Sequence, residues 1–73
     1  MDRLSDLPVG SVCTVGRIEG GAGSVKRFAQ FGLTEGTVIR VLVKSLCGDP
    51  TAYLVRGSVL AIRRENAKEI FVE

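Results

Sequence analysis

Residues 20–32 read Gly20-Gly21-Ala22-Gly23-Ser24-Val25-Lys26-Arg27-Phe28-Ala29-Gln30-Phe31-Gly32, and this stretch decides the fold because it places a helical pattern inside a β-type sequence. Val25, Phe28 and Ala29 follow the i, i+3, i+4 spacing of an apolar helix face. Ser24 is a suitable N-cap, and Gly32 stands where a left-handed residue ends a helix. We therefore predict a helix of about two turns, which needs Phe28 and Phe31 or Leu33 to dock on a sheet.

The glycines at 20–23 also invite a second interpretation, a phosphate-binding loop at a helix start. A Walker loop needs lysine directly after its last glycine, whereas Ser24 and Val25 follow Gly23 and Lys26 comes too late. A dinucleotide fingerprint starting at Gly21 would need glycine at position 26. The sequence therefore favours a flexible strand-to-helix connection over a nucleotide site.

Outside this stretch the chain predicts short strands. Residues 11–19 are rich in β-branched side chains, with Val12, Thr14 and Ile18 on one face and a bulge expected at Gly16. Residues 37–44 are almost continuously apolar, which suggests a strand covered on both faces over part of its length.

The second half of the chain continues the β pattern. Residues 47–50 form a turn tip, and strands at 52–56 and 58–63 are separated by Gly57 as a tight hairpin or a sharply bent strand. Leu60 and Ile62 are expected to face one way, and Val59 and Ala61 the other. One helical turn at 65–68 and a final strand at 70–72 follow. About five strands with one inserted α-helix fit a mainly β fold, a small barrel, because closure removes exposed edges.

Size and composition narrow the class of protein. A chain of 73 residues predicts a single domain spanning 1–73, and its apolar runs are too short to cross a bilayer. The first residues lack an apolar signal core, so we expect a cytoplasmic protein. The net charge of +2 is too small to indicate a polyanion-binding surface.

Catalytic and metal chemistry find little support in the residue types present. The chain has no histidine, which removes the Ser/His and Cys/His arrangements of nucleophilic catalysis. Cys13 and Cys47 lie far apart and are best interpreted as reduced thiols, although an intermolecular metal site through them stays open. We expect no enzyme, no cofactor and no metal site within one chain.

Several short segments, in order, resemble one family. They are Leu7-Pro8-Val9-Gly10, the run from Lys26-Arg27-Phe28 to Gly32-Leu33-Thr34-Glu35-Gly36, Gly48-Asp49-Pro50, Val55-Arg56-Gly57, Leu60-Ala61-Ile62-Arg63 and Ala67-Lys68-Glu69-Ile70-Phe71-Val72. Together they resemble the ferrous iron transport protein A family (FeoA) over nearly the whole chain. Phe31, Glu35 and Leu46-Cys47 depart from the family pattern, which usually has leucine, proline and Pro-Leu at these places.

The resemblance implies an SH3-like barrel that acts as an adaptor. Its expected partner is the large membrane Fe(II) transporter with a cytoplasmic G domain (FeoB-type), whose assembly or nucleotide cycle it would modulate. The chain would then lie peripheral to the inner membrane through this partner, without inserting into the membrane itself. Two surfaces are candidates for the contact: Lys26, Arg27, Gln30, Phe31, Leu33 and Thr34, and the turn tip Gly48, Asp49 and Pro50.

Some alternatives stay open at this point. Phe31 or Leu33 would be an anchor if exposed, and Leu33→Asp is then expected to weaken partner binding in a folded protein; either side chain could equally belong to the core. A nucleic-acid-binding barrel is the competing function, but it needs exposed aromatic side chains and the chain has only four aromatics. A homo-oligomer formed by strand swapping or metal bridging is a further alternative.

Overall fold

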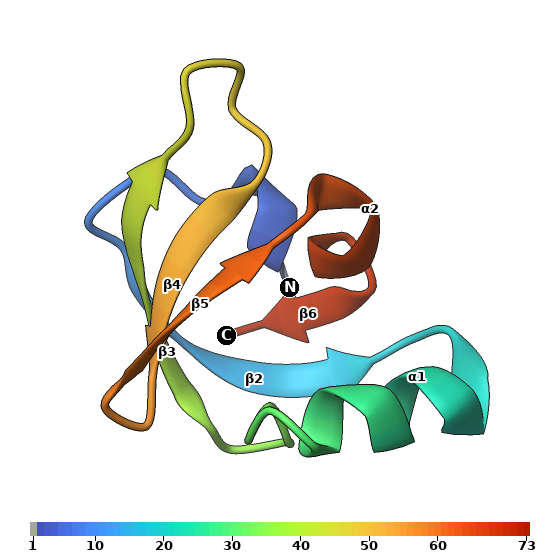
Figure 1. Cartoon of the computed structure of the whole chain (residues 1–73). Helices are drawn as coiled ribbons and strands as arrows, with labels where there is room; N and C mark the ends of the chain where they lie inside the picture. The colour runs from blue at the N-terminus through green and yellow to red at the C-terminus, as the bar shows by residue number, and fades with distance from the viewer. Residues whose placement is uncertain (1) are drawn as a thin grey trace.

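The computed structural model describes residues 2–73, which form a strongly curved antiparallel sheet with two helices beside it (Figure 1). The elements in chain order are β1 (Asp2–Arg3), the 3₁₀-helix η1 (Leu4–Asp6), β2 (Val12–Ile18), α1 (Gly21–Ala29), β3 (Val38–Lys44), β4 (Thr51–Val55), β5 (Ser58–Ile62), α2 (Arg64–Ala67) and β6 (Ile70–Val72). The strand, turn and helix order predicted from the sequence is thereby confirmed, with β1 and η1 as additions.

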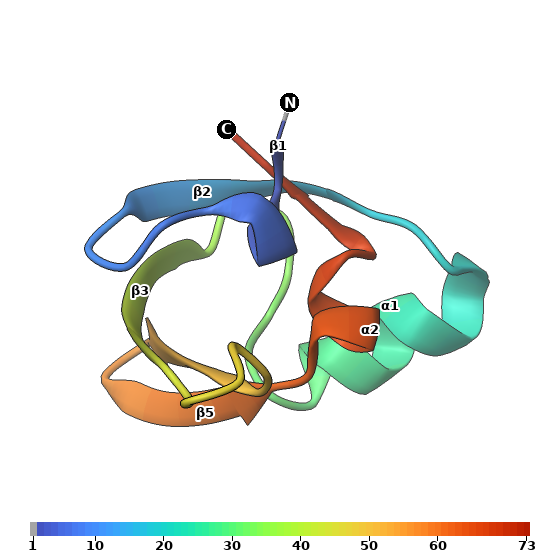
Figure 2. The same ribbon diagram turned by 90° about the horizontal axis from the view of Figure 1, so that it is seen from above.

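The six strands run in the order β1-β6-β2-β3-β4-β5 and curl into a barrel that is not closed by strand pairing (Figure 2). The two edge strands are β1 and β5. β1 was missed because it has two polar residues without alternation; it exists through its pairing with β6, Asp2 opposite Val72. This pairing also brings the two ends of the chain together (Figure 1).

The face of β2 that points into the barrel differs from the prediction. Cys13 and Val15 are buried, whereas Val12 is exposed. The pairing of β2 with β6 shifts register between Val15 and Arg17, so the expected bulge at Gly16 is present. Because of the bulge, even-numbered side chains after it face the side that odd-numbered side chains face before it. Ile18 therefore packs on the same core as Cys13 and Val15.

β3 is covered on one face only, and the expectation of two covered faces is wrong. Ile39 and Val41 are buried, but Val38 and Val43 are each 58% exposed. The outer side of the barrel carries no helix over this strand (Figures 1 and 2), so its outward apolar side chains stay in contact with solvent.

The helix α1 begins earlier than the sequence suggested. Gly20 is its N-cap with a φ of 95°, and residues 21–23 are helical, so the interpretation of Ser24 as the cap is wrong. Glycine tolerates this left-handed entry at no steric cost, which explains why a Gly-rich stretch can start a helix here. At the other end Gly32 has a φ of 80°, as predicted, and the Leu33 N–H donates to the Phe28 carbonyl oxygen at 3.0 Å.

β4 and β5 form the tight hairpin that was one of the two expected geometries. Val55 pairs with Ser58 across a two-residue turn in which Arg56 and Gly57 have φ values of 51° and 81°. Ile62 points inward and Val59 outward, as the alternation predicted. The barrel core consists of the inward side chains of all these elements: Leu4, Cys13, Val15, Phe28, Leu33, Ile39, Val41, Tyr53, Val55, Ile62, Ala67, Ile70 and Val72.

Candidate partner-binding site

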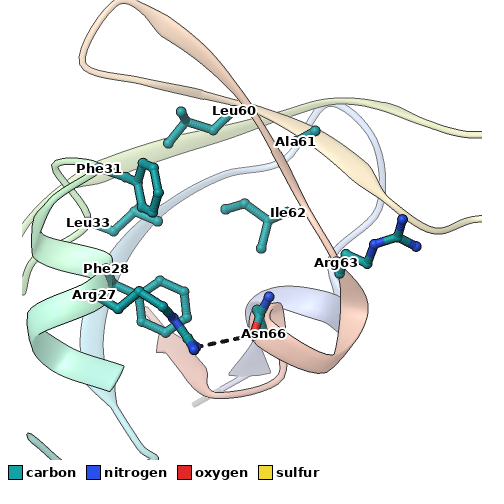
Figure 3. A pocket seen from close by; sticks show the side chains of 9 residues that line it. All are labelled: Arg27, Phe28, Phe31, Leu33, Leu60, Ala61, Ile62, Arg63 and Asn66. Atoms are coloured by element: carbon teal, nitrogen blue, oxygen red, sulfur yellow. Dashed lines mark hydrogen bonds between the residues drawn. The ribbon is translucent and has the colours of Figure 1, made fainter. Parts of the chain in front are cut away.

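A pocket of about 230 Å³ lies between the end of α1 and the β5–α2 segment (Figure 3). We call it the exit pocket because it opens where the chain leaves α1. Its lining residues come from two segments more than 25 residues apart in sequence: Arg27, Phe28, Phe31 and Leu33 from the first, and Leu60, Ala61, Ile62, Arg63 and Asn66 from the second.

Most of the residues that line the exit pocket are apolar, and its mouth carries one exposed aromatic ring. Phe28, Leu33 and Ile62 belong to the barrel core, while Phe31 is 56% exposed. Gly32 produces this division, because its left-handed backbone turns Leu33 inward directly after Phe31 has pointed outward. A concave apolar surface with an aromatic rim is the usual form of a small recognition site.

A hydrogen-bond cluster fixes the loop that carries Phe31 and Leu33. The Gly32 carbonyl oxygen accepts from Arg56 Nε and from the Thr37 hydroxyl, both at 3.0 Å. Thr37 Oγ1 also accepts from the Thr34 backbone N–H and from Arg56 Nη2, each at 3.2 Å. The tip of the β4–β5 hairpin thus holds the α1 exit in place, and two motifs that are separate in the sequence meet at one carbonyl oxygen.

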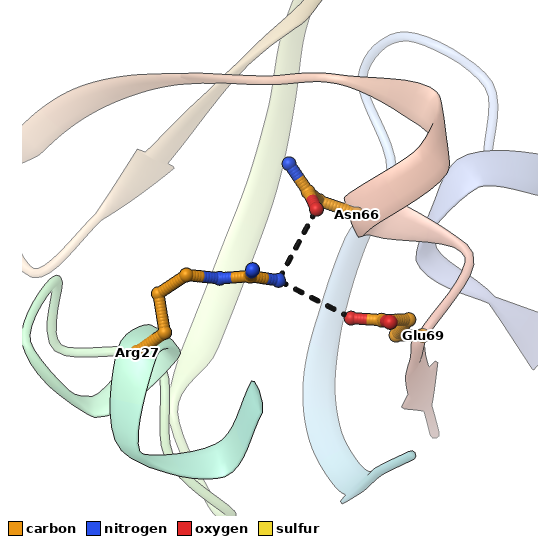
Figure 4. Close-up of polar contacts among 3 residues, drawn as sticks. All are labelled: Arg27, Asn66 and Glu69. Atoms are coloured by element: carbon orange, nitrogen blue, oxygen red, sulfur yellow. Dashed lines mark hydrogen bonds and ion pairs between the residues drawn. The ribbon is translucent and has the colours of Figure 1, made fainter. Parts of the chain in front are cut away.

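The polar side of the exit pocket is organised around Arg27. Its guanidinium donates to Asn66 Oδ1 at 3.2 Å and to Glu69 Oε2 at 3.4 Å (Figure 4). It also lies 5.1 Å from the centre of the Phe28 ring. Half of the Arg27 side chain is exposed, so these contacts orient the guanidinium more than they stabilise the fold.

The structure brings together only part of the first predicted surface. Arg27 and Phe31 line the exit pocket, whereas Lys26 and Gln30 are exposed on α1 outside it. Thr34 is half-buried beside Thr37. Leu33 lines the floor of the pocket but is only 1% exposed, so of the two alternatives for this residue, surface anchor or core, it is a core residue.

The second predicted surface, the turn at 48–50, lies on the connection between β3 and β4 and contributes no residue to the lining of the exit pocket. Asp49 Oδ1 accepts a hydrogen bond from the Arg64 backbone N–H at 2.9 Å, at the first residue of α2. Asp49 therefore has an internal role at a helix start. The exposed residues of this connection are Ser45, Leu46 and Cys47, which precede the predicted ones.

Sequence reasoning missed the half of the pocket that comes from β5 and α2. Leu60 and Ile62 were recognised as one face of a strand, but no local pattern links them to the helix at 21–29. Asn66 was part of a polar helical turn with no indicated partner. The two segments are linked by contacts that exist only in the folded chain, from Arg27 to Asn66 and Glu69.

Metal-ligating and titratable side chains are the next feature of the described part of the chain. Among residues 2–73, no three His, Cys, Asp or Glu side chains are placed to hold a metal ion. Burial raises the pKa of the Cys13 thiol, so this buried group is less reactive than an ordinary cysteine. Neither helix in residues 2–73 is long and apolar enough to cross a membrane.

The aromatic side chains do not form a stacking surface of the kind that nucleic-acid-binding barrels use. Tyr53 and Phe28 are buried, and Phe71 is half-buried beneath the guanidinium groups of Arg3 and Arg17, 5.3 and 4.8 Å from its ring centre. Phe31 is the one aromatic residue that is mostly exposed among residues 2–73.

The six-stranded, partly open antiparallel barrel with one short helix after β2 has an SH3-like fold. The sequence model of the FeoA domain matches residues 3–73. The chain therefore belongs to the FeoA family, a family of small accessory domains linked to ferrous iron transport.

Known relatives agree in sequence and in structure. The chain is 34% identical over 71 residues to the Fe(2+) transport protein A/Fe(2+) transporter FeoB fusion protein of Porphyromonas gingivalis, and it spans 97% of its own length but 8% of that protein. The solution structure of FeoA from Chlorobium tepidum aligns with a TM-score of 0.89 at 29% identity, covering 99% of this chain and 69% of that one. The zinc-complexed FeoA of Stenotrophomonas maltophilia, a prokaryotic SH3 domain protein, has a TM-score of 0.84 at 23% identity over 100% and 91% of the two chains.

Proposed function

We propose that this chain is an accessory protein of ferrous iron uptake that binds the cytoplasmic part of a FeoB-type transporter and modulates its assembly or its nucleotide cycle. The observation that carries the proposal is the relative in which an FeoA segment and FeoB are fused. Fusion keeps two segments at high effective concentration, and it is typical of segments that work together.

The exit pocket supplies the surface for this contact. Phe31 stands at its mouth as an exposed anchor beside the apolar side chains of Leu60 and Ile62. Arg27 and Arg63 supply positive charge at the rim, which steers toward an acidic partner surface. In this proposal the chain works as one domain over 1–73, in the cytoplasm, with no cofactor, catalysis or nucleic acid of its own.

The test measures binding of the full chain to the purified cytoplasmic region of the FeoB-type transporter of the same organism. Phe31→Ala is expected to weaken binding at least about tenfold, because truncating a central aromatic anchor typically costs more than 1.4 kcal/mol. Val43→Ala is the matched control: Val43 is as exposed as Phe31, but it lies on β3, which contributes nothing to the pocket. Both variants should keep the folded NMR spectrum.

Modulation is measured separately, as the GTP hydrolysis rate and the oligomeric state of the transporter with and without the chain. A rate or assembly change that is lost in Phe31→Ala and kept in Val43→Ala supports the proposal. Equal binding by both variants would remove the exit pocket as the contact surface. Absence of any binding by the unmodified chain, or tight and salt-sensitive binding to an oligonucleotide instead, would overturn the adaptor function.

A further inference from the structure

β5 is an edge strand whose outer side makes no backbone hydrogen bond in the described structure. It pairs only with β4, and the two-residue turn makes Val55 and Ser58 a hydrogen-bonded pair. By alternation, the backbone groups of Leu60 and Ile62 also point toward β4. The N–H and C=O groups of Val59 and Ala61 therefore point away from the sheet, and within residues 2–73 none of them is bonded to another segment.

The exit pocket runs along this free edge. Four consecutive residues of the segment, Leu60 to Arg63, line it, although side chains of a strand alternate between faces. Figure 3 shows Leu60 and Ile62 on the pocket side of the strand and the side chains of Ala61 and Arg63 on the other side. Ala61 and Arg63 therefore border the pocket with main-chain atoms, and the pocket exposes both apolar side chains and backbone hydrogen-bonding groups.

The sequence of β5 lacks the features that normally protect an edge. Natural edge strands are blunted by charged residues, proline or bulges, whereas Ser58-Val59-Leu60-Ala61-Ile62 has no charge and no proline and pairs with β4 in unbroken register. The neighbouring charges are positive: the pocket lining includes Arg27 and Arg63 and no carboxylate. Glu69 lies next to Arg27 but outside the lining.

From these observations we infer that the exit pocket takes an extended peptide segment of the partner, which adds to β5 as a further antiparallel or parallel strand. The segment places one apolar side chain against Phe31, Leu60 and Ile62 and carries a carboxylate that reaches Arg27 or Arg63. This mode of recognition gains affinity from main-chain hydrogen bonds and specificity from alternate side chains. The inference rests on the proposed function and names the kind of contact that the function would use.

The decisive variant removes a backbone donor without touching the pocket side chains. Ala61→Pro deletes the outward N–H of residue 61, and proline is tolerated on an edge strand because its missing N–H faces solvent. Ala61→Thr is the matched control, since it changes the same outward side chain and keeps the N–H. Both variants should fold, which amide NMR spectra and urea unfolding would verify.

The probes are the cytoplasmic region of the transporter and overlapping synthetic peptides that cover its sequence. We expect Ala61→Pro to weaken binding of that region and of one acidic, apolar peptide by about tenfold or more, and Ala61→Thr to bind as the unmodified chain does. In the complex, hydrogen exchange at the Val59 and Ala61 amides should slow, because only a paired strand protects these outward groups.

The remaining outcomes separate the two proposals. If the cytoplasmic region binds the unmodified chain and both variants equally, the adaptor function stands and strand addition is overturned. If the unmodified chain binds neither that region nor any peptide, the adaptor function fails and the inference falls with it. If the chain self-associates in sedimentation experiments and Ala61→Pro restores the monomer, the occupant of the edge is a second copy, which also overturns the inference.

Discussion

The segment that leaves α1 at the exit pocket, residues 30–36, and the β3–β4 turn at 45–50 are alike in sequence and different in structure. Each follows a regular element, contains a glycine with positive φ, and exposes one large apolar side chain, Phe31 or Leu46. Phe31 borders a concave surface because β5 and α2 lie opposite it (Figure 3), whereas Leu46 is fully exposed and does not line the exit pocket. The comparison teaches that an exposed apolar residue becomes a candidate site only when a distant segment completes a cavity around it.

The largest expected difference in the free energy of unfolding is between the variants Leu33→Asp and Leu46→Asp. Leu33 is fully enclosed, so the substitution creates a cavity and buries a carboxylate, which should cost at least about 4 kcal/mol and unfold a chain of this size. Leu46 is fully exposed, and its substitution should change the free energy of unfolding by less than about 0.5 kcal/mol. Circular dichroism and urea titration measure both; a folded Leu33→Asp protein would contradict its placement in the core.

A smaller difference is expected between the two glycines, Gly32→Ala and Gly48→Ala. Both residues have φ near 80°, so each alanine should cost about 1–2 kcal/mol of backbone strain. At Gly32 the new Cβ would come within 3.0 Å of Arg56 Cδ and displace a side chain that makes two hydrogen bonds, adding about 1 kcal/mol. At Gly48 the nearest atom is the free end of Arg64, at 3.3 Å. Equal unfolding midpoints for the two variants would show that the Arg56 cluster adds nothing.

Asp49→Ala tests whether the turn serves the fold. Loss of the bond from Asp49 Oδ1 to the Arg64 N–H should destabilise the protein by about 1 kcal/mol, the usual value of a helix-capping side chain. Asp49→Asn keeps an acceptor oxygen, and it should lower the free energy of unfolding by only about a few tenths of a kcal/mol. A variant Asp49→Ala with unchanged urea midpoint but weakened transporter binding would return the turn to the candidate contact surfaces.

The last prediction needs no substitution and compares the reactivity of the two thiols, Cys47 in the turn and Cys13 in β2. Cys47, exposed in the turn, should react with a thiol reagent at pH 8, while Cys13 should react only after unfolding. The thiolate is the reactive form, and burial raises the pKa of Cys13, so its thiolate fraction stays lower than that of an ordinary thiol as the pH rises. Rapid labelling of two thiols per folded chain would show that the β2 side of the barrel opens.

The elements were predictable where local patterns decide them. The hairpin, the Gly32 helix end and the bulge at Gly16 each depend on one residue type at one position, and all three are confirmed. The prediction of the inward face of β2 is wrong because the alternation of inward and outward side chains shifts by one residue across a bulge. The bulge itself was expected. β1 could not be predicted, since two polar residues become a strand only when β6 lies beside them.

The candidate site was predictable only on its helical side. Arg27 and Phe31 were selected from the sequence, but the choice between surface and core for Leu33 depends on one left-handed backbone turn. The residues of β5 that complete the pocket lie about 30 positions away, and periodicity carries no information on such distances. Asp49 was selected for its exposed turn, whereas its hydrogen bond to α2 required the fold to be known.

The pairing of β1 with β6 has a consequence for tethered partners. Both chain ends leave the barrel at one point, on the side away from β5 (Figure 2), so a linker attached to either end starts from nearly the same place. To reach the exit pocket it must pass around a molecule whose extents are 32 × 23 × 21 Å. A flexible linker of about 20 residues has a root-mean-square span of about 25 Å, and it would give a fused partner its highest local concentration at the pocket. A shorter tether must be stretched further to reach the pocket, which lowers the local concentration of the partner there.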